Sequence, residues 1–265
     1  MIACDFPLFV PGNKPDRFAK AIAAAHDAVV IDLEDAVTAE EKATSRDALV
    51  DQKDLLDRAA VSVFIRVNGR NTKWYADDVA CCADLPIAGV ILPKSQSGED
   101  LRALASALPG EMLRLALIET AAGLVEVASI ARQASRLVFG SIDFCADLGC
   151  EHDRLALLRP RQDLVLWSRL AGLPAPIDGV TTALRDEDLI REDAAHAAML
   201  GFGGKLLIHP AQIPAALAGF APSDADTAWA QRVLDGSSGE AVAVDGAMVD
   251  APVLVRAQAI LDRNR

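Results

Sequence analysis

The feature that most constrains this chain is an alternation, repeated eight times, of a short apolar run with a longer segment of helical character. The apolar runs lie at residues 6–10, 29–33, 63–67, 89–92, 114–118, 136–140, 176–180 and 205–208. In the segments between them, apolar positions recur every three or four residues, as on the buried face of a helix. Strands that are apolar throughout and alternate with helices indicate a parallel sheet covered on its outer face. Eight such units predict a (β/α)8 barrel.

An open doubly wound sheet is the main alternative for this pattern. It is disfavoured because no GxGxxG turn follows the first apolar run. A chain of 265 residues suits a single barrel, which we predict to span residues 1–235. Residues 236–265 combine a Gly/Ser turn, an alternating strand, an Asp-Gly hairpin signal and a helix that starts at a proline. We interpret them as a C-terminal hairpin and helix that packs on the barrel or on a neighbouring subunit.

The charge of the chain excludes some partners. A formal net charge of −12 disfavours binding to nucleic acid or to an anionic membrane, because the field of the protein repels both. The apolar stretches are far shorter than the roughly 20 residues that cross a bilayer, and the start of the chain lacks the basic segment of a secretory signal. The five cysteines form no CxxC pair, which disfavours a thiolate zinc site or a disulfide framework. We therefore expect a cytoplasmic protein with reduced thiols.

Polar side chains follow the apolar runs at the point where each predicted strand ends. In a (β/α)8 barrel these positions form one rim, and active sites are built there. The set comprises Asp32, Glu34, Asp35, Arg66, Asn68, Lys94, Glu119, Asp143, Asp178 and His209. Seven of the eight predicted strands thus deliver an ionisable group to this rim, which indicates a site with chemistry. For any single residue, a helix cap or an ion pair between loops is the simpler interpretation.

Glu119 and Asp143 end the fifth and sixth predicted strands, which are neighbours in the barrel. Their carboxylates should approach one another, and two close carboxylates repel unless a proton or a cation lies between them. Two oxygen ligands, completed by water and substrate oxygens, are a common way to hold Mg²⁺. We predict that these two residues bind magnesium. The alternative is that Glu119 accepts backbone hydrogen bonds and Asp143 caps the next helix.

Arg66 ends the third predicted strand, and its planar fork suits the capture of a carboxylate or carbonyl oxygen. It can equally pair with acidic residues across the rim, and both contacts can exist together. The acidic cluster after the second predicted strand carries more negative charge than a metal site needs. One of Glu34 and Asp35 is therefore expected to orient Arg66 or metal-bound water, and the other to cap the helix near Ala39.

Two further groups are weaker candidates when judged from the residues alone. The loop that contains Lys14 and Arg17 precedes a helix that starts at a proline, a geometry able to hold phosphate, although Pro-Gly-Asn is also an ordinary turn. Asp250 stands directly before the last helix, where an N-cap role alone explains it. His209 is interpreted as a packed residue, and the remaining histidines form no cluster with metal-ligand spacing.

These segments together resemble the citrate lyase β-subunit-like branch of the HpcH/HpaI aldolase family. The matching pieces are LFVPGNKPDRF, VVIDLEDAV, FIRVNG, GVILPKS, LALIETAAGL, LVFGSIDFCADLG, APIDGV, GFGGKLLIHPAQI and DGAMVDAP. They run nearly end to end and occur in one order, which is far more specific than any single motif. The resemblance implies a (β/α)8 barrel, commonly trimeric, that uses Mg²⁺ on CoA or acyl-carrier thioesters of malate, citrate or citramalate type.

The resemblance also implies roles for individual residues. Glu119 and Asp143 would ligate magnesium, and Arg66 would hold a substrate oxyanion or carboxylate. Lys14 and Arg17 would lie near the CoA moiety. In CoA-lyase relatives the aspartate that matches Asp250 is a catalytic acid or base donated by a neighbouring subunit. We therefore expect a magnesium-dependent carbon–carbon lyase; the alternatives are a malyl-CoA-type thioesterase and a non-catalytic subunit of a lyase complex.

Overall fold

The computed structural model describes residues 2–236, 242–244 and 247–262. Eight parallel strands follow one another around the sheet in chain order. The strands are β1 (Pro7–Pro11), β2 (Ala28–Asp32), β3 (Ser62–Arg66), β4 (Gly89–Leu92), β5 (Leu113–Ile118), β6 (Arg136–Phe139), β7 (Ile177–Asp178) and β8 (Gly204–Lys205). An isolated parallel bridge between Leu8 of β1 and Leu207, two residues after β8, brings the end of the sheet back to its start. The predicted (β/α)8 barrel is confirmed.

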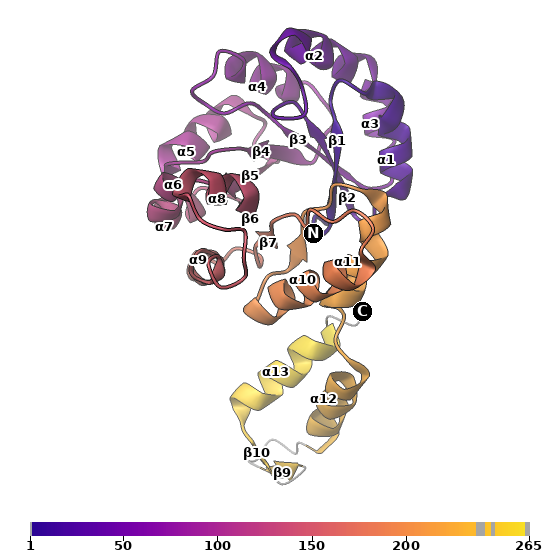
Figure 1. The fold of residues 1–265 in the computed structure, drawn as a ribbon, viewed down its shortest axis with the longest axis vertical. Helices are drawn as coiled ribbons and strands as arrows, with labels where there is room; N and C mark the ends of the chain where they lie inside the picture. The colour runs from indigo at the N-terminus through magenta and orange to yellow at the C-terminus, as the bar shows by residue number, and fades with distance from the viewer. Residues whose placement is uncertain (1, 237–241, 245–246, 263–265) are drawn as a thin grey trace.

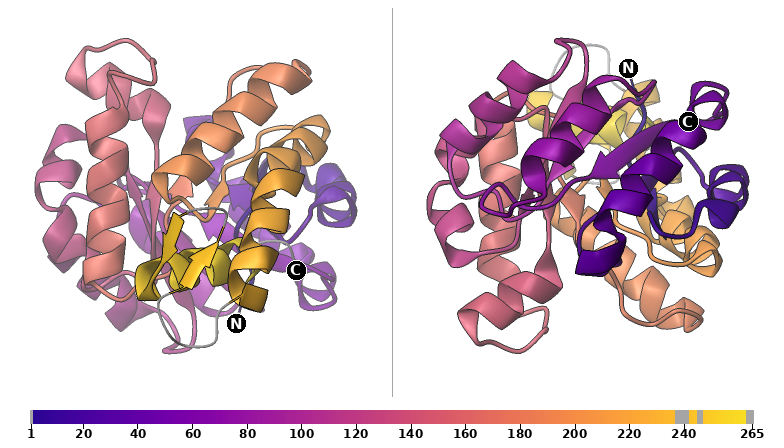
Figure 2. Two further views of the ribbon diagram at one scale, coloured as in Figure 1. Left: turned by 90° about the horizontal axis from the view of Figure 1, so that it is seen from below. Right: turned by 90° about the horizontal axis from the view of Figure 1, so that it is seen from above.

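Helices surround the barrel and connect successive strands (Figures 1 and 2). The α-helices are α1 (Phe18–Ala24), α2 (Lys42–Asp51), α3 (Lys53–Asp57), α4 (Tyr75–Ala83), α5 (Gly98–Ala107), α6 (Ala121–Val125), α7 (Val127–Ala131), α8 (Ser141–Leu148), α9 (Leu158–Leu170), α10 (Glu187–Leu200), α11 (Ile213–Phe220), α12 (Asp224–Gly236) and α13 (Ala251–Asp262). Three short 3-10 helices are η1 (Pro15–Arg17), η2 (Ala39–Glu41) and η3 (Pro210–Gln212). In the described part of the chain, no helix combines the length and apolarity needed to cross a membrane.

Alternate residues of each strand fill the inside of the barrel or pack against the helices. The inner cluster includes Val30, Phe64, Leu117 and Val138, all nearly or fully buried. The residues between them belong to the larger cluster shared with the helix layer. Because side chains on a strand alternate with a period of two, the residue two positions beyond each inner side chain also faces the barrel axis. This periodicity decides which polar residues reach the mouth of the barrel.

The C-terminal segment forms a separate lobe below α10 and α11 in Figure 1. Strands β9 (Val242–Val244) and β10 (Ala247–Val249) pair antiparallel, as the hairpin signal predicts, while the turn at residues 245–246 lies outside the described residues. Helices α12 and α13 share a small apolar core that contains Val233 and Ile260. The predicted domain boundary at residues 235–236 falls at the end of α12, and this shared core leads us to propose that the lobe begins before α12.

Asp178 does not reach the rim, contrary to the prediction. In β7 it is Ile177 that belongs to the inner cluster, so Asp178 points outward into the helix layer and is only 1% exposed. Its carboxylate accepts hydrogen bonds from Arg161 Nε at 2.9 Å and from Lys205 Nζ at 3.1 Å. Burial alone would raise the pKa of Asp178, but Lys205 and Arg161 outweigh it and hold the pKa below the ordinary value of 3.8.

This buried ion pair predicts a loss of stability in acid. A carboxyl group with a lowered folded-state pKa stabilises the fold above its unfolded pKa and loses that contribution as the pH falls through the folded value. We expect the free energy of unfolding, measured with urea, to fall steeply below pH about 4. The Asp178→Asn variant should be less stable at neutral pH by about 3–5 kcal/mol and should show a shallower acid slope. An unchanged slope would show that other groups control acid unfolding; Asp51→Asn, at an exposed position, is the control.

Candidate active site

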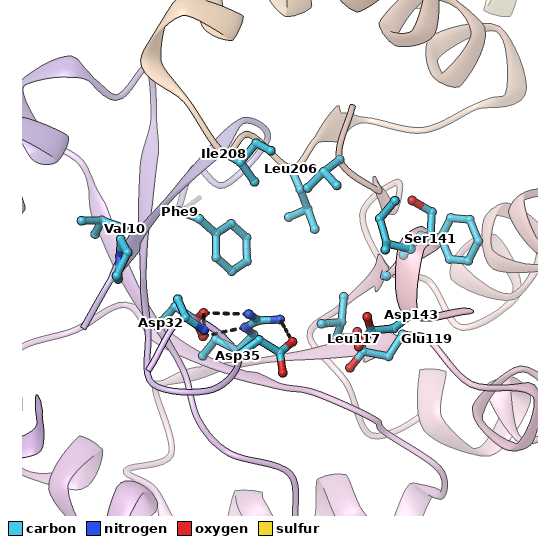
Figure 3. Close-up of a pocket in the computed structure, with 17 residues that line it drawn as sticks. Phe9, Val10, Asp32, Asp35, Leu117, Glu119, Ser141, Asp143, Leu206 and Ile208 are labelled. Carbon is cyan, nitrogen blue, oxygen red and sulfur yellow. Dashed lines mark hydrogen bonds and ion pairs between the residues drawn. The ribbon is translucent and has the colours of Figure 1, made fainter. Parts of the chain in front are cut away.

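A cavity of about 440 Å³ opens at the carboxyl ends of the strands. Figure 3 shows Glu119 and Asp143 side by side on one side of this cavity and Asp32 and Asp35 on another. The apolar part of the lining comprises Phe9, Val10, Pro11, Ala36, Leu117, Phe139, Ile142, Val180, Leu206 and Ile208. The cavity therefore has an acidic floor that is opposed by an apolar wall, an arrangement suited to a small ligand with one polar end.

Strand periodicity explains why Asp32, Arg66 and Glu119 face this cavity. They stand two residues beyond the inner side chains of Val30, Phe64 and Leu117, respectively. The register pairs Asp32 directly with Arg66 across β2 and β3. Here the strand-end prediction and the structure agree.

Arg66 is held by a fork of acidic side chains. Its Nε and Nη2 atoms donate to the two carboxylate oxygens of Asp32, each at 2.7 Å. Nη1 lies 3.1 Å from a Glu34 oxygen and 3.5 Å from an Asp35 oxygen, and the guanidinium stacks 5.1 Å from the Phe9 ring centroid. Burial would lower the pKa of Arg66, but Asp32 outweighs it, so the guanidinium stays charged. The bidentate pair fixes its plane, which leaves it preorganised at the edge of the cavity.

The loop after β2 differs in one respect from the prediction. Asp32 accepts the backbone N–H groups of Glu34 and Ala36, at 2.9 and 3.0 Å. The 3-10 helix η2 begins at Ala39 with no side-chain cap, so neither Glu34 nor Asp35 has the predicted capping role there. Both contact Arg66 instead. The buried Lys42 ammonium donates to the carbonyl oxygens of Leu33 and Glu34, at 2.7 and 2.6 Å, and so fixes the loop.

Lys94, predicted at the rim without a specific role, lies between three carboxylates. Its Nζ is 2.8 Å from Glu34 Oε1, 3.3 Å from Asp143 Oδ2 and 3.9 Å from Glu119 Oε1. The backbone at Lys94 has φ of 47°, a left-handed conformation that is uncommon outside glycine. It directs the Lys94 N–H to Glu119 Oε1 at 2.7 Å. Lys94 alone thus contributes both an ammonium group and a backbone amide to the acidic floor.

Glu119 is a buried carboxyl group, 2% exposed, whose position depends on the glycine that directly follows the neighbouring strand β6. A Cβ atom at Gly140 would come within 2.4 Å of Glu119 Oε2, so only glycine leaves room for the carboxylate. Burial first, and then the charge of Glu34, raise the pKa of Glu119 to about 8. The protein thus pays a free-energy penalty to keep this group ionised, which a nearby cation would remove.

The charges of the floor fit a divalent cation. Two cationic side chains, Arg66 and Lys94, face five carboxyl groups, those of Asp32, Glu34, Asp35, Glu119 and Asp143. With all groups ionised, the floor keeps an excess of three negative charges. Among the described residues, no group of three or more His, Cys, Asp or Glu side chains forms a complete metal site. Two carboxylates whose coordination is completed by water and substrate match Mg²⁺, which retains several waters in many sites.

Ser141 and His152 form a polar contact beside this floor that sequence reasoning missed. Ser141 begins α8 and lines the cavity. His152 Nε2 lies 3.0 Å from Ser141 Oγ. Burial and the charge of Arg161 lower the pKa of His152, so the ring is neutral at pH 7. The position of Ser141 two residues before Asp143 was the one signal in the sequence; nothing there places His152 against it.

Four predicted site residues do not line the cavity: Glu34, which still contacts Arg66, and Lys14, Arg17 and Asp250. Lys14 and Arg17 are exposed at η1 and do not line it. Asp250 is exposed in the C-terminal lobe, where its Oδ1 accepts the Val253 N–H at 3.3 Å, as expected of an N-cap. His209 caps η3 by accepting the Ala211 N–H at 3.1 Å. Within one subunit, only residues of the barrel build the floor of the site.

The parallel barrel and the acidic, partly apolar cavity at the carboxyl ends of its strands define the class of protein. This is a (β/α)8 barrel with a cavity where enzymes of this fold have their active sites. Residues 6–210 match the sequence profile of the HpcH/HpaI aldolase/citrate lyase family. The chain belongs to this family. Its similarity to citrate lyase β-like proteins extends over nearly the whole chain, as the expected resemblance requires.

Similar proteins include both lyase-named and thioesterase-named members. A citrate lyase subunit beta-like protein of Deinococcus radiodurans is 38% identical over 97% of this chain and 96% of its own length. A (3S)-malyl-CoA thioesterase of Cereibacter sphaeroides is 37% identical over 96% of this chain and 92% of its own. Among solved structures, the CitE protein of Mycobacterium tuberculosis in complex with magnesium, acetoacetate and coenzyme A has a TM-score of 0.86 and 34% identity, with 98% of each chain covered.

Proposed function

We propose that this protein is a magnesium-dependent carbon–carbon lyase that acts on a short hydroxyacyl-CoA of the citryl, citramalyl or malyl type. The products are acetyl-CoA, or an acetyl carrier, and a 2-oxo acid. The observation that carries this proposal is the cavity, in which Glu119, Asp143 and Arg66 converge on one acidic floor. The lyase-named relative and the solved structure that holds magnesium, acetoacetate and coenzyme A support the same substrate class.

In this proposal Glu119 and Asp143 hold Mg²⁺, which when bound supplies a Lewis acid for an oxygen of the substrate. Arg66 stabilises the negative charge that develops on the substrate as the carbon–carbon bond breaks or forms. Asp32, Glu34 and Asp35 act on Arg66, because their contacts fix the guanidinium in one orientation. The apolar wall limits access of water to the bound substrate.

Proton transfer needs a group that the floor lacks, since its carboxylates are engaged by Arg66, Lys94 and the metal. We assign it to Asp250 of a neighbouring subunit in a cytoplasmic homotrimer. Support comes from the lobe, which in Figure 1 extends away from the barrel and leaves Asp250 exposed rather than in the cavity of its own chain. In this assignment Asp250 moves the proton at the methyl carbon of the acetyl group. Lys14 and Arg17, exposed near the rim, contact the CoA phosphates.

The proposed proton transfer by Asp250 can be tested separately from its role as a helix cap. Asparagine caps helices as well as aspartate does, so Asp250→Asn should leave the melting temperature unchanged. It cannot carry the proton, and turnover should fall about 10²- to 10⁴-fold. Asp250→Ala should lose the same activity and, in addition, about 1 kcal/mol of stability. Wild-type turnover in Asp250→Asn would reduce Asp250 to a helix cap.

Hydrolysis of a malyl-CoA thioester is the second candidate, favoured by the 37% identity to (3S)-malyl-CoA thioesterase. The same floor can polarise the thioester carbonyl for attack by water. Malyl-, citramalyl- and citryl-CoA, each incubated with enzyme and Mg²⁺ and resolved by mass, separate the two reactions. Acetyl-CoA with a 2-oxo acid identifies the lyase, whereas free hydroxy acid with CoA identifies the thioesterase and refutes the first proposal.

A further inference from the structure

Two cysteines meet where α8 ends. Gly149 adopts a left-handed conformation with φ of 73° and terminates the helix. The N–H groups of Gly149 and Cys150 both donate to the carbonyl oxygen of Cys145, at 2.8 and 3.1 Å. In helix ends of this kind, the side chain of the residue after the glycine packs against the side chain five residues before it. Here those positions hold two thiols, Cys145 and Cys150.

The two thiols differ in exposure. Cys145 is 7% exposed and its Sγ also donates to the Glu151 carbonyl at 3.5 Å, whereas Cys150 is half-buried. Cys150 is thus the thiol that a reagent in solution reaches first, and Cys145 is the neighbour that can resolve the product.

The residues that follow connect this pair to the cavity. Residues 149–152, here called the strap, fold back along one face of α8. The Cys150 N–H donates to the Cys145 carbonyl oxygen at 3.1 Å, and His152 Nε2 lies 3.0 Å from Ser141 Oγ. Ser141 and Cys145 are four residues apart and lie on the same face of the helix. Because Ser141 lines the cavity, the strap is in contact with a residue of the cavity wall.

We propose that Cys145 and Cys150 are a reversible modification site, which forms an intramolecular disulfide by exchange with a small-molecule disulfide such as oxidised glutathione. The disulfide holds its sulfur atoms about 2 Å apart, closer than two thiols that are not bonded to each other. Oxidation therefore draws Cys150 toward α8 and shifts His152 relative to Ser141. This inference rests on the thiol geometry and does not depend on the reaction that the enzyme catalyses.

The exchange proceeds in two steps. The Cys150 thiolate attacks one sulfur of the small disulfide, a new S–S bond forms, and one small thiolate leaves. The Cys145 thiolate then attacks Cys150 Sγ, the Cys145–Cys150 bond forms, and the second small thiolate leaves. The protons lost by the two protein thiols neutralise the released thiolates. The protein dithiol is oxidised and the small disulfide is reduced to two thiols.

The test uses the full chain, treated with oxidised glutathione and then alkylated under denaturing conditions. Trypsin releases residues 137–154 as one peptide that contains both cysteines. We expect this peptide to be two hydrogen atoms lighter than the reduced form and free of alkyl groups, with dithiothreitol reversing the change. Cys150→Ser should abolish this product. Cys81→Ser, which alters a cysteine of α4 that is also half-buried, should leave it intact.

A second measurement follows the strap itself. The ring resonance of His152, assigned in proton NMR spectra by its loss in His152→Gln, should shift between the reduced and oxidised wild-type protein, and should not shift when Cys150→Ser is treated in the same way. Full alkylation of both cysteines, or a glutathione adduct that persists on Cys150, would overturn the proposed disulfide. A disulfide that leaves the His152 resonance in place would overturn the link to the cavity wall.

Discussion

Replacing Asp143 with Asn is expected to lower Mg²⁺-dependent turnover by about a thousandfold or more, because loss of a metal ligand removes several kcal/mol of stabilisation from the transition state. The fold should survive. The side chain of Asp143 is 39% exposed on the first turn of α8, and it pairs with the partly exposed Lys94 at 3.3 Å. Turnover, the affinity for Mg²⁺ by calorimetry and the melting temperature should be measured together.

Asp147→Asn is the matched control for this prediction. Asp147 lies on the same helix and accepts the Ala121 N–H at 2.7 Å, but it does not line the cavity. Its replacement removes one charge from α8 and should leave both Mg²⁺ affinity and turnover close to wild type. Full activity in Asp143→Asn would refute the metal assignment, and equal losses in both variants would indicate a general effect of charge.

Arg66→Met is expected to cost both activity and stability. The substitution leaves the carboxylate of Asp32, 3% exposed, without its bidentate partner. Breaking a buried pair in this way costs about 3–5 kcal/mol, which corresponds to a fall in Tm of roughly 10 °C for a chain of this size. Turnover should fall as well, because the guanidinium that stabilises the substrate charge in the proposed reaction is lost. Thermal unfolding and steady-state kinetics measure the two effects.

The double variant Asp32→Asn with Arg66→Met separates these effects. Neutralising Asp32 removes the uncompensated buried charge, so part of the lost stability should return. Activity should not return, because the guanidinium is still absent. A melting temperature of Arg66→Met equal to wild type would show that the ion pair contributes no net stability, and recovery of turnover in the double variant would remove Arg66 from the proposed reaction.

Much of the fold was predictable because the barrel strands are nearly continuous apolar runs. The predicted run at 63–67 corresponds to β3 within one residue, and the run at 89–92 matches β4. The last run, at 205–208, corresponds less well, because β8 comprises only Gly204–Lys205. A strand this short is defined by its pairing with its neighbours, which sequence periodicity does not report.

The direction of a site residue was predictable where the sequence showed which residues of its strand face the inside of the barrel. Arg66 and Glu119 each follow a clear inner residue by two positions, so their direction was fixed. The prediction that Asp178 lies at the rim was wrong because β7 has only two residues. Whether a side chain of β7 points inward or outward depends on the register with β6. No role could be assigned to Lys94 or His152 from the sequence, because their partners are distant along the chain. The partners of Lys94 are 25 or more residues away, and that of His152 is 11 residues away. Such contacts are created by the closure of the barrel and the path of its loops.

The position of a bound metal ion tests the central claim most directly. Mn²⁺ favours the same octahedral oxygen ligands as Mg²⁺, and its anomalous X-ray scattering locates it in a crystal without reference to activity. We expect one strong peak at the mouth of the barrel, within coordination distance of a carboxylate oxygen of Glu119 and one of Asp143. No peak there, or a peak bound by other residues while these two carboxylates remain paired with Lys94, would contradict the account.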